Sequence, residues 1–303
     1  MKDYEFDIND WLGTFPLESY DADALMSGHG PADICYTEQI RRLAAKQGNL
    51  GRPVPVDVFV LAYGEPERRD ITKIGGLPYR PADKPWPVSV ESGKEMTFIA
   101  QFRFTESKDI VGPVPDDILL CFFDETAVYD SESFPGPPVF EWYPLGMENL
   151  ISSEQLPTPQ FAFPTCYGVR HRTVDYVDER AFELVRSIVP PEFLKHCNEE
   201  ADVRETVLYD CILGMFKIGG ATVWDAPETW RLEQEVKKAR DMPKNVLCSL
   251  SEIYVPSEGQ YPWLNFLEEQ CTESMMLHWS SSGIVYLFLD DQGTVQPRFQ
   301  GTG

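Results

Sequence analysis

The sequence is short of positive charge over two long stretches. No Lys or Arg occurs in residues 109–169 or 245–297, and the whole chain has 26 Lys and Arg against 49 Asp and Glu, a formal net charge of −23. A negative field of this size repels nucleic acids and anionic membranes and attracts basic proteins. We therefore expect no direct binding of nucleic acid or membrane, and a basic protein as the partner. The alternative is that the charge serves only to keep the protein in solution.

Motifs for catalysis and metal binding are scarce. The four histidines lack the His-Glu-x-x-His spacing of zinc enzymes, and no Gly-x-Ser-x-Gly elbow occurs. We interpret the loop Ser280–Gly283 as a hydrogen-bonded turn rather than a nucleophile loop. The pairs Asp124–Glu125 and Asp290–Asp291 contain oxygen ligands suited to Ca²⁺, but adjacent residues on a strand point to opposite faces, which favours solvated turn residues. We expect neither an enzyme nor a cofactor.

Cysteine usage and hydropathy predict a cytoplasmic protein. The seven cysteines include no Cys-x-x-Cys pair, and several lie in apolar runs, as is typical of a reducing compartment. No apolar run reaches the length of about 18 residues that a membrane-spanning helix needs. The first residues, Met1–Asp7, lack the basic and apolar parts of a signal peptide.

A tetrapeptide, Lys73-Ile-Gly-Gly76, returns unchanged as Lys217–Gly220. Each copy precedes a Trp and two apolar strands in the same order, which indicates a duplicated unit. The expected strands are Thr97–Phe104 and Ile118–Glu125 after the first copy, and Val246–Ile253 and Ile284–Asp291 after the second. Neither copy continues into a phosphate-binding motif, so we interpret both as packing motifs. Valine at Gly75 or Gly76 should then destabilise the fold.

These elements predict an α+β fold with two related, mostly antiparallel β-sheet units and intervening helices. A further strand is expected at Val54–Ala62. Helical signals predict helices at Glu38–Gln47, Asp178–Val189 and Asp202–Met215, with a short turn at Glu192–Asn198, and the charged segment Glu228–Arg240 is also expected to be helical. The predicted division is an acidic arm and helix at 1–53 and a domain at 54–303. That domain contains a first β unit at 54–169, a helical connection at 170–215 and a second β unit at 216–303.

Several of these residues together resemble the YwqG-like family, a domain of unknown function. The resemblance rests on Lys73-Ile-Gly-Gly-Leu-Pro with Trp86-Pro87, on Phe98–Phe102, on a strand ending at Asp124, on Gly219-Gly220 with Trp224, and on Trp279–Phe288. Ser280 and Ser281 depart from the Gly and Asp of the family pattern. The resemblance implies a mixed α and β fold with two sheet units and no settled catalytic residues. Some relatives are immunity proteins paired with secreted antibacterial toxins.

Resemblance and charge together predict an immunity protein that binds a cognate basic toxin and occludes its active cleft. The toxin is expected to be a nuclease, a DNase, delivered by a secretion system such as type VI. We expect the partner on the base-free stretch 109–169, where acids steer association and aromatic rings anchor the complex. The expected partner-binding residues are Asp116, Asp117, Asp130, Glu132, Trp142 and Tyr143. For Trp142, burial in the core is an equally good interpretation. The alternative function is a small-molecule or calcium-binding module, or an uncharacterised enzyme, with a cleft between the two units.

Overall fold

The structure, a computed structural model, describes most of the first half of the chain and parts of the second. The described segments are 52–124, 136–157, 165–177, 216–222, 246–251, 253–254, 276–277 and 284–300, together with Asn9, Leu12, Cys35, Glu38, Gln39, Arg42 and Lys46. The predicted helices at 178–189, 202–215 and 228–240 and the predicted turn at 192–198 lie outside these residues, as does most of the arm at 1–53.

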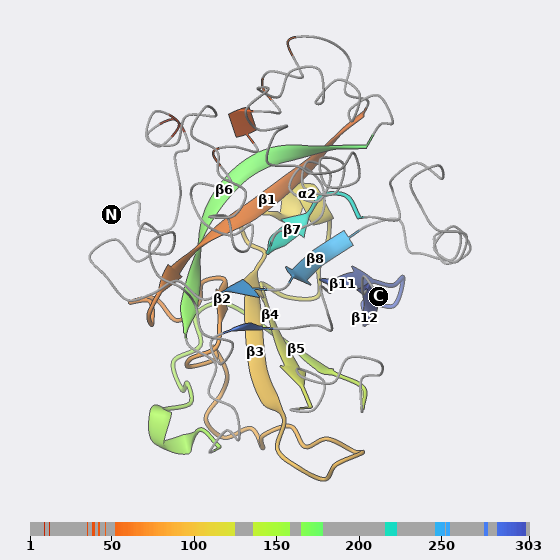
Figure 1. The fold of residues 1–303 in the computed structure, drawn as a ribbon. Helices are drawn as coiled ribbons and strands as arrows, with labels where there is room; N and C mark the ends of the chain where they lie inside the picture. The colour runs from red at the N-terminus through yellow and green to blue at the C-terminus, as the bar shows by residue number, and fades with distance from the viewer. Residues whose placement is uncertain are drawn as a thin grey trace.

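Ten strands form one continuous antiparallel sheet (Figure 1). The sheet order is β12-β11-β8-β7-β1-β6-β2-β3-β4-β5. In chain order the strands are β1 (Arg52–Tyr63), β2 (Lys73–Ile74), β3 (Thr97–Arg103), β4 (Ile118–Phe123), β5 (Val139–Tyr143), β6 (Cys166–Val177), β7 (Lys217–Gly219), β8 (Val246–Ser251), β11 (Ile284–Leu289) and β12 (Val295–Gln300). A separate pair joins β9 (Ile253–Tyr254) to β10 (Met276–Leu277). The five apolar runs that the sequence predicted as strands are confirmed as β1, β3, β4, β8 and β11.

The predicted fold class, α+β with two sheet units and intervening helices, is wrong. The described chain is mostly antiparallel strand, and its single sheet curls until it nearly closes on itself. Helical structure in the described residues is limited to α2 (Lys108–Val111), two short 3-10 pieces that include η5 (Ser153–Gln155), and the helical backbone at Cys35, Glu38, Gln39, Arg42 and Lys46. Glu38, Gln39, Arg42 and Lys46 lie within the predicted helix Glu38–Gln47 and confirm helix at those positions, whereas Cys35 precedes it.

The repeat is visible inside this one sheet as a symmetric strand order. β2-β3-β4-β5 lie on one side of the central pair β1 and β6, and β7-β8-β11-β12 lie on the other. Each of the two Lys-Ile-Gly-Gly strands pairs with one of the two central strands: β2 pairs with β6, and β7 pairs with β1. The two units therefore share their central strands and cannot be two independent sheets. The predicted domain boundaries stay a prediction.

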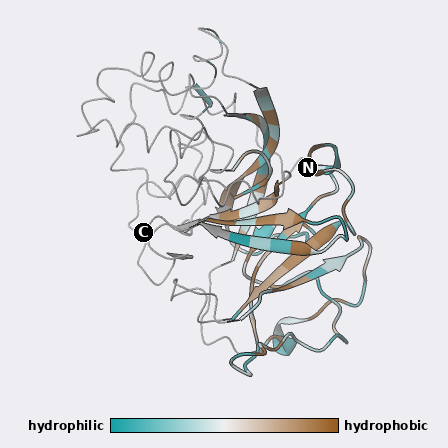
Figure 2. Ribbon diagram, turned by 90° about the vertical axis from the view of Figure 1, so that its right-hand side faces the viewer, coloured by the Kyte–Doolittle hydropathy of each residue, from teal (hydrophilic) through white to brown (hydrophobic). Residues whose placement is uncertain are grey.

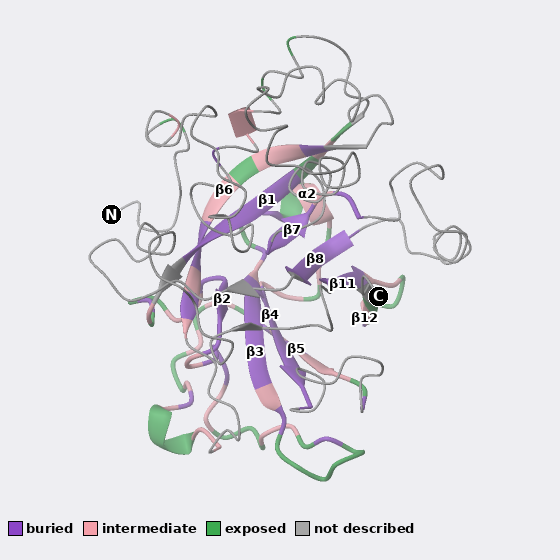
Figure 3. Cartoon of the chain, viewed as in Figure 1, coloured by how far each residue is buried: buried purple, intermediate pink, exposed green. Residues whose placement is uncertain are grey.

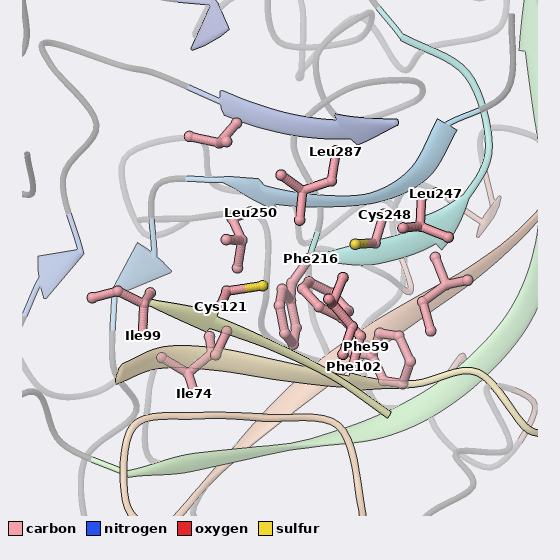
Figure 4. Packing of buried hydrophobic residues seen from close by; sticks show 14 of the residues in the cluster. Phe59, Ile74, Ile99, Phe102, Cys121, Phe216, Leu247, Cys248, Leu250 and Leu287 are labelled. Atoms are coloured by element: carbon pink, nitrogen blue, oxygen red, sulfur yellow. The ribbon is translucent and has the colours of Figure 1, made fainter. Parts of the chain in front are cut away.

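The curled sheet encloses the main hydrophobic core. Phe59 of β1 and Phe102 of β3 pack against Phe216, with ring centroids 5.7 and 4.6 Å apart (Figure 4). On the far side, Cys248 of β8 and Leu287 of β11 belong to the same cluster. Strands from both repeat units therefore share one core. Many strand residues are hydrophobic (Figure 2), and β3, β4 and β7 are buried along most of their length (Figure 3).

A second core lies on the outer face of β3 and β4. Leu119, Cys121 and Phe123 point into the curled sheet, whereas Ile118, Leu120 and Phe122 alternate with them and point outward. The outward set packs under the Gly- and Pro-rich stretch that follows β2, including Tyr79, Trp86 and Met96. β4 is consequently buried on both faces, which explains its unbroken apolar sequence Ile-Leu-Leu-Cys-Phe-Phe.

Candidate partner-docking surface

The structure brings four of the six predicted partner-binding residues to one end of the β4–β5 pair. Asp116 and Asp117 directly precede β4, and Ile118 of β4 is paired with Tyr143 of β5. Asp117 accepts hydrogen bonds from the Lys108 ammonium at 2.7 Å and from the Leu145 amide at 3.4 Å. The bond from Lys108 is the main reason that the pKa of Asp117 lies below its ordinary value. Asp130 and Glu132 lie outside the described residues.

The two predicted aromatic anchors point to opposite faces of β5 and are both largely covered. Trp142 is half-buried and packs on Phe104 of the main core, with centroids 5.4 Å apart. Its Nε1 is buried without a hydrogen-bond partner among the described residues. Tyr143 is only 7% exposed and belongs to the outer core. For both rings the geometry favours a core role, and the partner-binding role of the six residues stays a prediction.

Tyr143 belongs to a buried polar network that the sequence analysis did not foresee. The Arg80 guanidinium, fully buried, donates from Nε to Glu141 Oε2 at 2.7 Å and from its two terminal nitrogens to the carbonyls of Lys84 and Pro85. The Tyr143 hydroxyl donates to the same Glu141 oxygen at 2.7 Å. Burial alone would raise the pKa of Glu141, but the bonds from Arg80 and Tyr143 outweigh it and lower that pKa.

Arg80 also explains the Trp that follows the first Gly-Gly. The Arg80 guanidinium lies 5.4 Å from the Trp86 ring centroid, and Trp86 meets Phe122 edge-on at 5.3 Å. Trp86 Nε1 donates to the Met96 carbonyl at 2.7 Å. The stretch from Gly75 to Trp86 thus closes over the outer core through one buried cation and one indole. These described contacts support the packing interpretation of the stretch.

Each Lys-Ile-Gly-Gly copy wraps a carboxylate, and we call this arrangement the carboxylate clasp. In the first clasp, the Lys73 ammonium and the Leu77 amide both bind the carboxylate of Glu65. In the second, the Lys217 ammonium and the Ala221 amide bind Asp175 Oδ2, both at 2.9 Å. In both copies the lysine begins the motif and the amide belongs to the residue after the second glycine. The repeated tetrapeptide is therefore a repeated carboxylate-binding turn.

The second glycine of each clasp lies where a side chain would be strained. Gly76 and Gly220 have φ values of 67° and 78°. A Cβ on Gly76 would lie 2.1 Å from Glu65 Oε2, and one on Gly220 would lie 2.4 Å from Asp175 Oδ2. The left-handed backbone and the bound carboxylate each require glycine. The acids themselves could not be found from the sequence, because Glu65 and Asp175 stand at unequal distances before their lysines.

Three basic side chains of the described chain form buried ion pairs. Lys73, Arg80 and Lys217 are buried in the pairs described above. Asp57 is also buried and forms an ion pair with Arg172 of β6. The Arg172 guanidinium also pairs with the exposed Asp109, at 2.7 Å. In the described part of the chain, these buried basic side chains are therefore occupied by acids of the same chain.

Asp124 and Asp290, the first acids of the pairs that follow β4 and β11, have packing and turn contacts, and Glu125 lies outside the described residues. Asp124 is buried and accepts a hydrogen bond from the Ser92 hydroxyl at 2.7 Å. Asp290 Oδ1 accepts the amides of Gln292 and Thr294, at 2.9 and 2.8 Å, and so closes the β11–β12 turn. Among the described residues no group of three or more His, Cys, Asp or Glu is placed to hold a metal ion. The loop Ser280–Gly283 lies outside the described part.

Comparison with known proteins gives one family match. A model described as a domain of unknown function (DUF1963) matches residues 72–137, which contain β2, β3, α2 and β4 of the first repeat unit. This match fits the resemblance to the YwqG-like family over residues 72–137, and it names neither an immunity protein nor a toxin. No curated protein matches the chain. Within the described residues, none of the helices is long and apolar enough to cross a membrane.

Proposed function

We propose that the protein is an immunity protein that binds a basic antibacterial toxin and occludes its active cleft. The observation that carries the proposal is the net charge of −23. In addition, the buried basic side chains Arg80 and Lys217 form ion pairs with acids of the same chain. A surface of this sign attracts a basic protein from a distance and repels other acidic molecules.

A nuclease is the toxin class that fits this surface best. A nuclease grips a polyanion, so its active cleft presents positive charge. An acidic protein that docks on this cleft competes with the nucleic acid for the same charges. Binding and inhibition then follow from one contact, without any catalytic group on the inhibitor.

The Asp116–Asp117 turn supplies one fixed acidic point for this contact. Asp117 is held by Lys108 and by the Leu145 amide, and Asp116 accepts the amide of Asp117 at 2.9 Å. Because these bonds fix the carboxylates before the partner arrives, little conformational entropy is lost on binding.

Growth protection tests the proposal. The full chain and the product of the neighbouring reading frame are expressed from separately inducible promoters in the same cells. We expect the neighbour alone to arrest growth and the full chain to restore it, whereas a pore-forming toxin of unrelated sequence should still arrest growth. The proposal is wrong if the neighbour is not toxic, or if growth stays arrested at equal levels of both proteins.

A further inference from the structure

The segment Pro87–Met96, which we call the valine hairpin, projects from the sheet just before β3 (Figures 1 and 3). Its two arms are joined by hydrogen bonds from the Ser89 amide to the Lys94 carbonyl at 2.8 Å and from the Met96 amide to the Pro87 carbonyl at 2.9 Å. Val88 and Glu95 form an antiparallel bridge between the same arms. The segment is therefore a folded hairpin with a defined outer face.

In the valine hairpin, Val88 and Val90 are exposed to solvent and the polar Ser89 between them is buried. Val88 is 51% exposed and Val90 is 81% exposed, whereas Ser89 between them is 4% exposed. The Ser89 hydroxyl accepts the amides of Glu91 and Ser92, both at 3.3 Å. An ordinary surface strand has the opposite alternation, with polar residues outward. Val88 and Val90 are the large hydrophobic residues that the described chain leaves exposed.

Several contacts hold the valine hairpin on the core. The Ser92 hydroxyl donates to buried Asp124, and Trp86 Nε1 donates to the Met96 carbonyl, each at 2.7 Å. Gly136 packs so closely that a Cβ there would lie 3.0 Å from Glu91 Cγ. A hairpin fixed in this way loses little entropy when a partner binds.

The carboxylates beside Val88 and Val90 indicate which kind of partner the valine hairpin would bind. Glu91 and Glu95 are exposed and form no ion pair within the described part of the chain, and Lys94 is the one base of the hairpin. Two apolar side chains beside two carboxylates fit a basic polypeptide with an apolar contact at its centre. A second copy of this chain would bring its own Glu91 and Glu95, and its net charge of −23, against the same acids.

We propose that the valine hairpin is a docking element, whose Val88 and Val90 anchor a basic polypeptide partner while Glu91 and Glu95 guide its approach. The inference rests on the proposed function, because the toxin is the basic partner in question. It differs from the predicted surface at Trp142 and Tyr143, whose rings are largely covered. The valines contribute mainly to the lifetime of the complex, and the glutamates to the rate of its formation.

Binding kinetics of the full chain with the inactivated product of the neighbouring reading frame test the inference. We expect the double change Val88→Ser and Val90→Ser to speed dissociation by about tenfold or more, as truncation of an interface anchor does. The double change Glu91→Gln and Glu95→Gln should slow association and flatten its salt dependence. The matched control, Glu67→Gln with Glu154→Gln, also removes two exposed carboxylates and should change association less.

The outcomes separate the inference from the proposed function. If the unmodified chain binds and protects but both hairpin variants bind with unchanged rates, the docking element lies elsewhere and the function stands. If the unmodified chain does not bind the neighbour at all, the function fails and the inference fails with it. Sedimentation checks the remaining occupant: a dimer of the unmodified chain that Val88→Ser and Val90→Ser abolish would mean that the hairpin binds a second copy.

Discussion

Replacing Gly76 by Ala tests the carboxylate clasp most sharply. Gly76 has a φ of 67°, and left-handed backbone costs a residue with a Cβ about 1–2 kcal/mol. The new Cβ would also lie 2.1 Å from Glu65 Oε2 and 2.6 Å from the Thr165 side chain, so the Glu65 carboxylate must shift, which disturbs its bonds with the Leu77 amide and Lys73. A buried charge that loses its partner costs about 3–5 kcal/mol. Because the Glu65 side chain is 35% exposed, solvent screens this pair, so we expect the ion-pair cost to fall below that range and the total, with the backbone cost, to be about 3 kcal/mol.

Gly220→Ala and Gly146→Ala complete the comparison. In the second clasp the Cβ would meet Asp175 Oδ2 at 2.4 Å, and Asp175 and Lys217 are both 1% exposed, so Gly220→Ala should cost more than Gly76→Ala. Gly146 has a φ of 83° but no atom within 4 Å of its Cβ position, so it reports the backbone cost alone. Urea unfolding followed by tryptophan fluorescence gives the three free energies. If Gly76→Ala and Gly220→Ala agree with Gly146→Ala within about 0.5 kcal/mol, the clasps do not stabilise the fold.

Three further predictions concern the buried groups. Arg80→Lys keeps the charge but cannot reach Glu141 and two carbonyls at once, so thermal unfolding should show a loss of about 2 kcal/mol or more, and unchanged stability would contradict the network. The pKa of Glu141 is lowered in the folded protein. Its contribution to stability is therefore present above its unfolded pKa of about 4.3 and is lost as the pH falls through the folded pKa. Glu141→Gln should reduce the drop in urea midpoint between pH 5 and pH 3. Burial raises the pKa of the Cys121 and Cys248 thiols, so a thiol reagent should modify both far more slowly in the folded protein than in urea, and equal rates would place them at the surface.

Local elements were predictable because each strand has its own sequence signal. The apolar runs at Thr97–Phe104 and Ile284–Asp291 became β3 and β11, and the Lys-Ile-Gly-Gly repeat indicated the duplication that the strand order displays. The fold class was not predictable in the same way. β2 pairs with β6 and β7 pairs with β1, and no local pattern encodes such an exchange between distant strands.

For the candidate docking residues, the sequence does not predict which side chains are covered and which face solvent. The sequence predicted no strand at Val139–Tyr143, and it could not show that the two faces of β5 are covered, one by the main core and one by the outer core. Conversely, the alternation Val88-Ser89-Val90 resembles an ordinary short strand. Only the fold shows that its apolar side faces solvent.

The salt dependence of association tests the central claim, that this acidic surface captures a basic partner. The association rate of the full chain with the inactivated neighbour product is measured at about 0.02 M and about 0.15 M salt, where screening shortens to about 8 Å. A variant with Asp116, Asp117 and Asp130 changed to Asn and Glu132 changed to Gln is measured beside it. We predict that the rate of the unmodified chain falls steeply with salt and that the variant associates more slowly with a flatter slope. A rate that does not depend on salt, or a variant with the same rate and slope, would contradict steering by these acids.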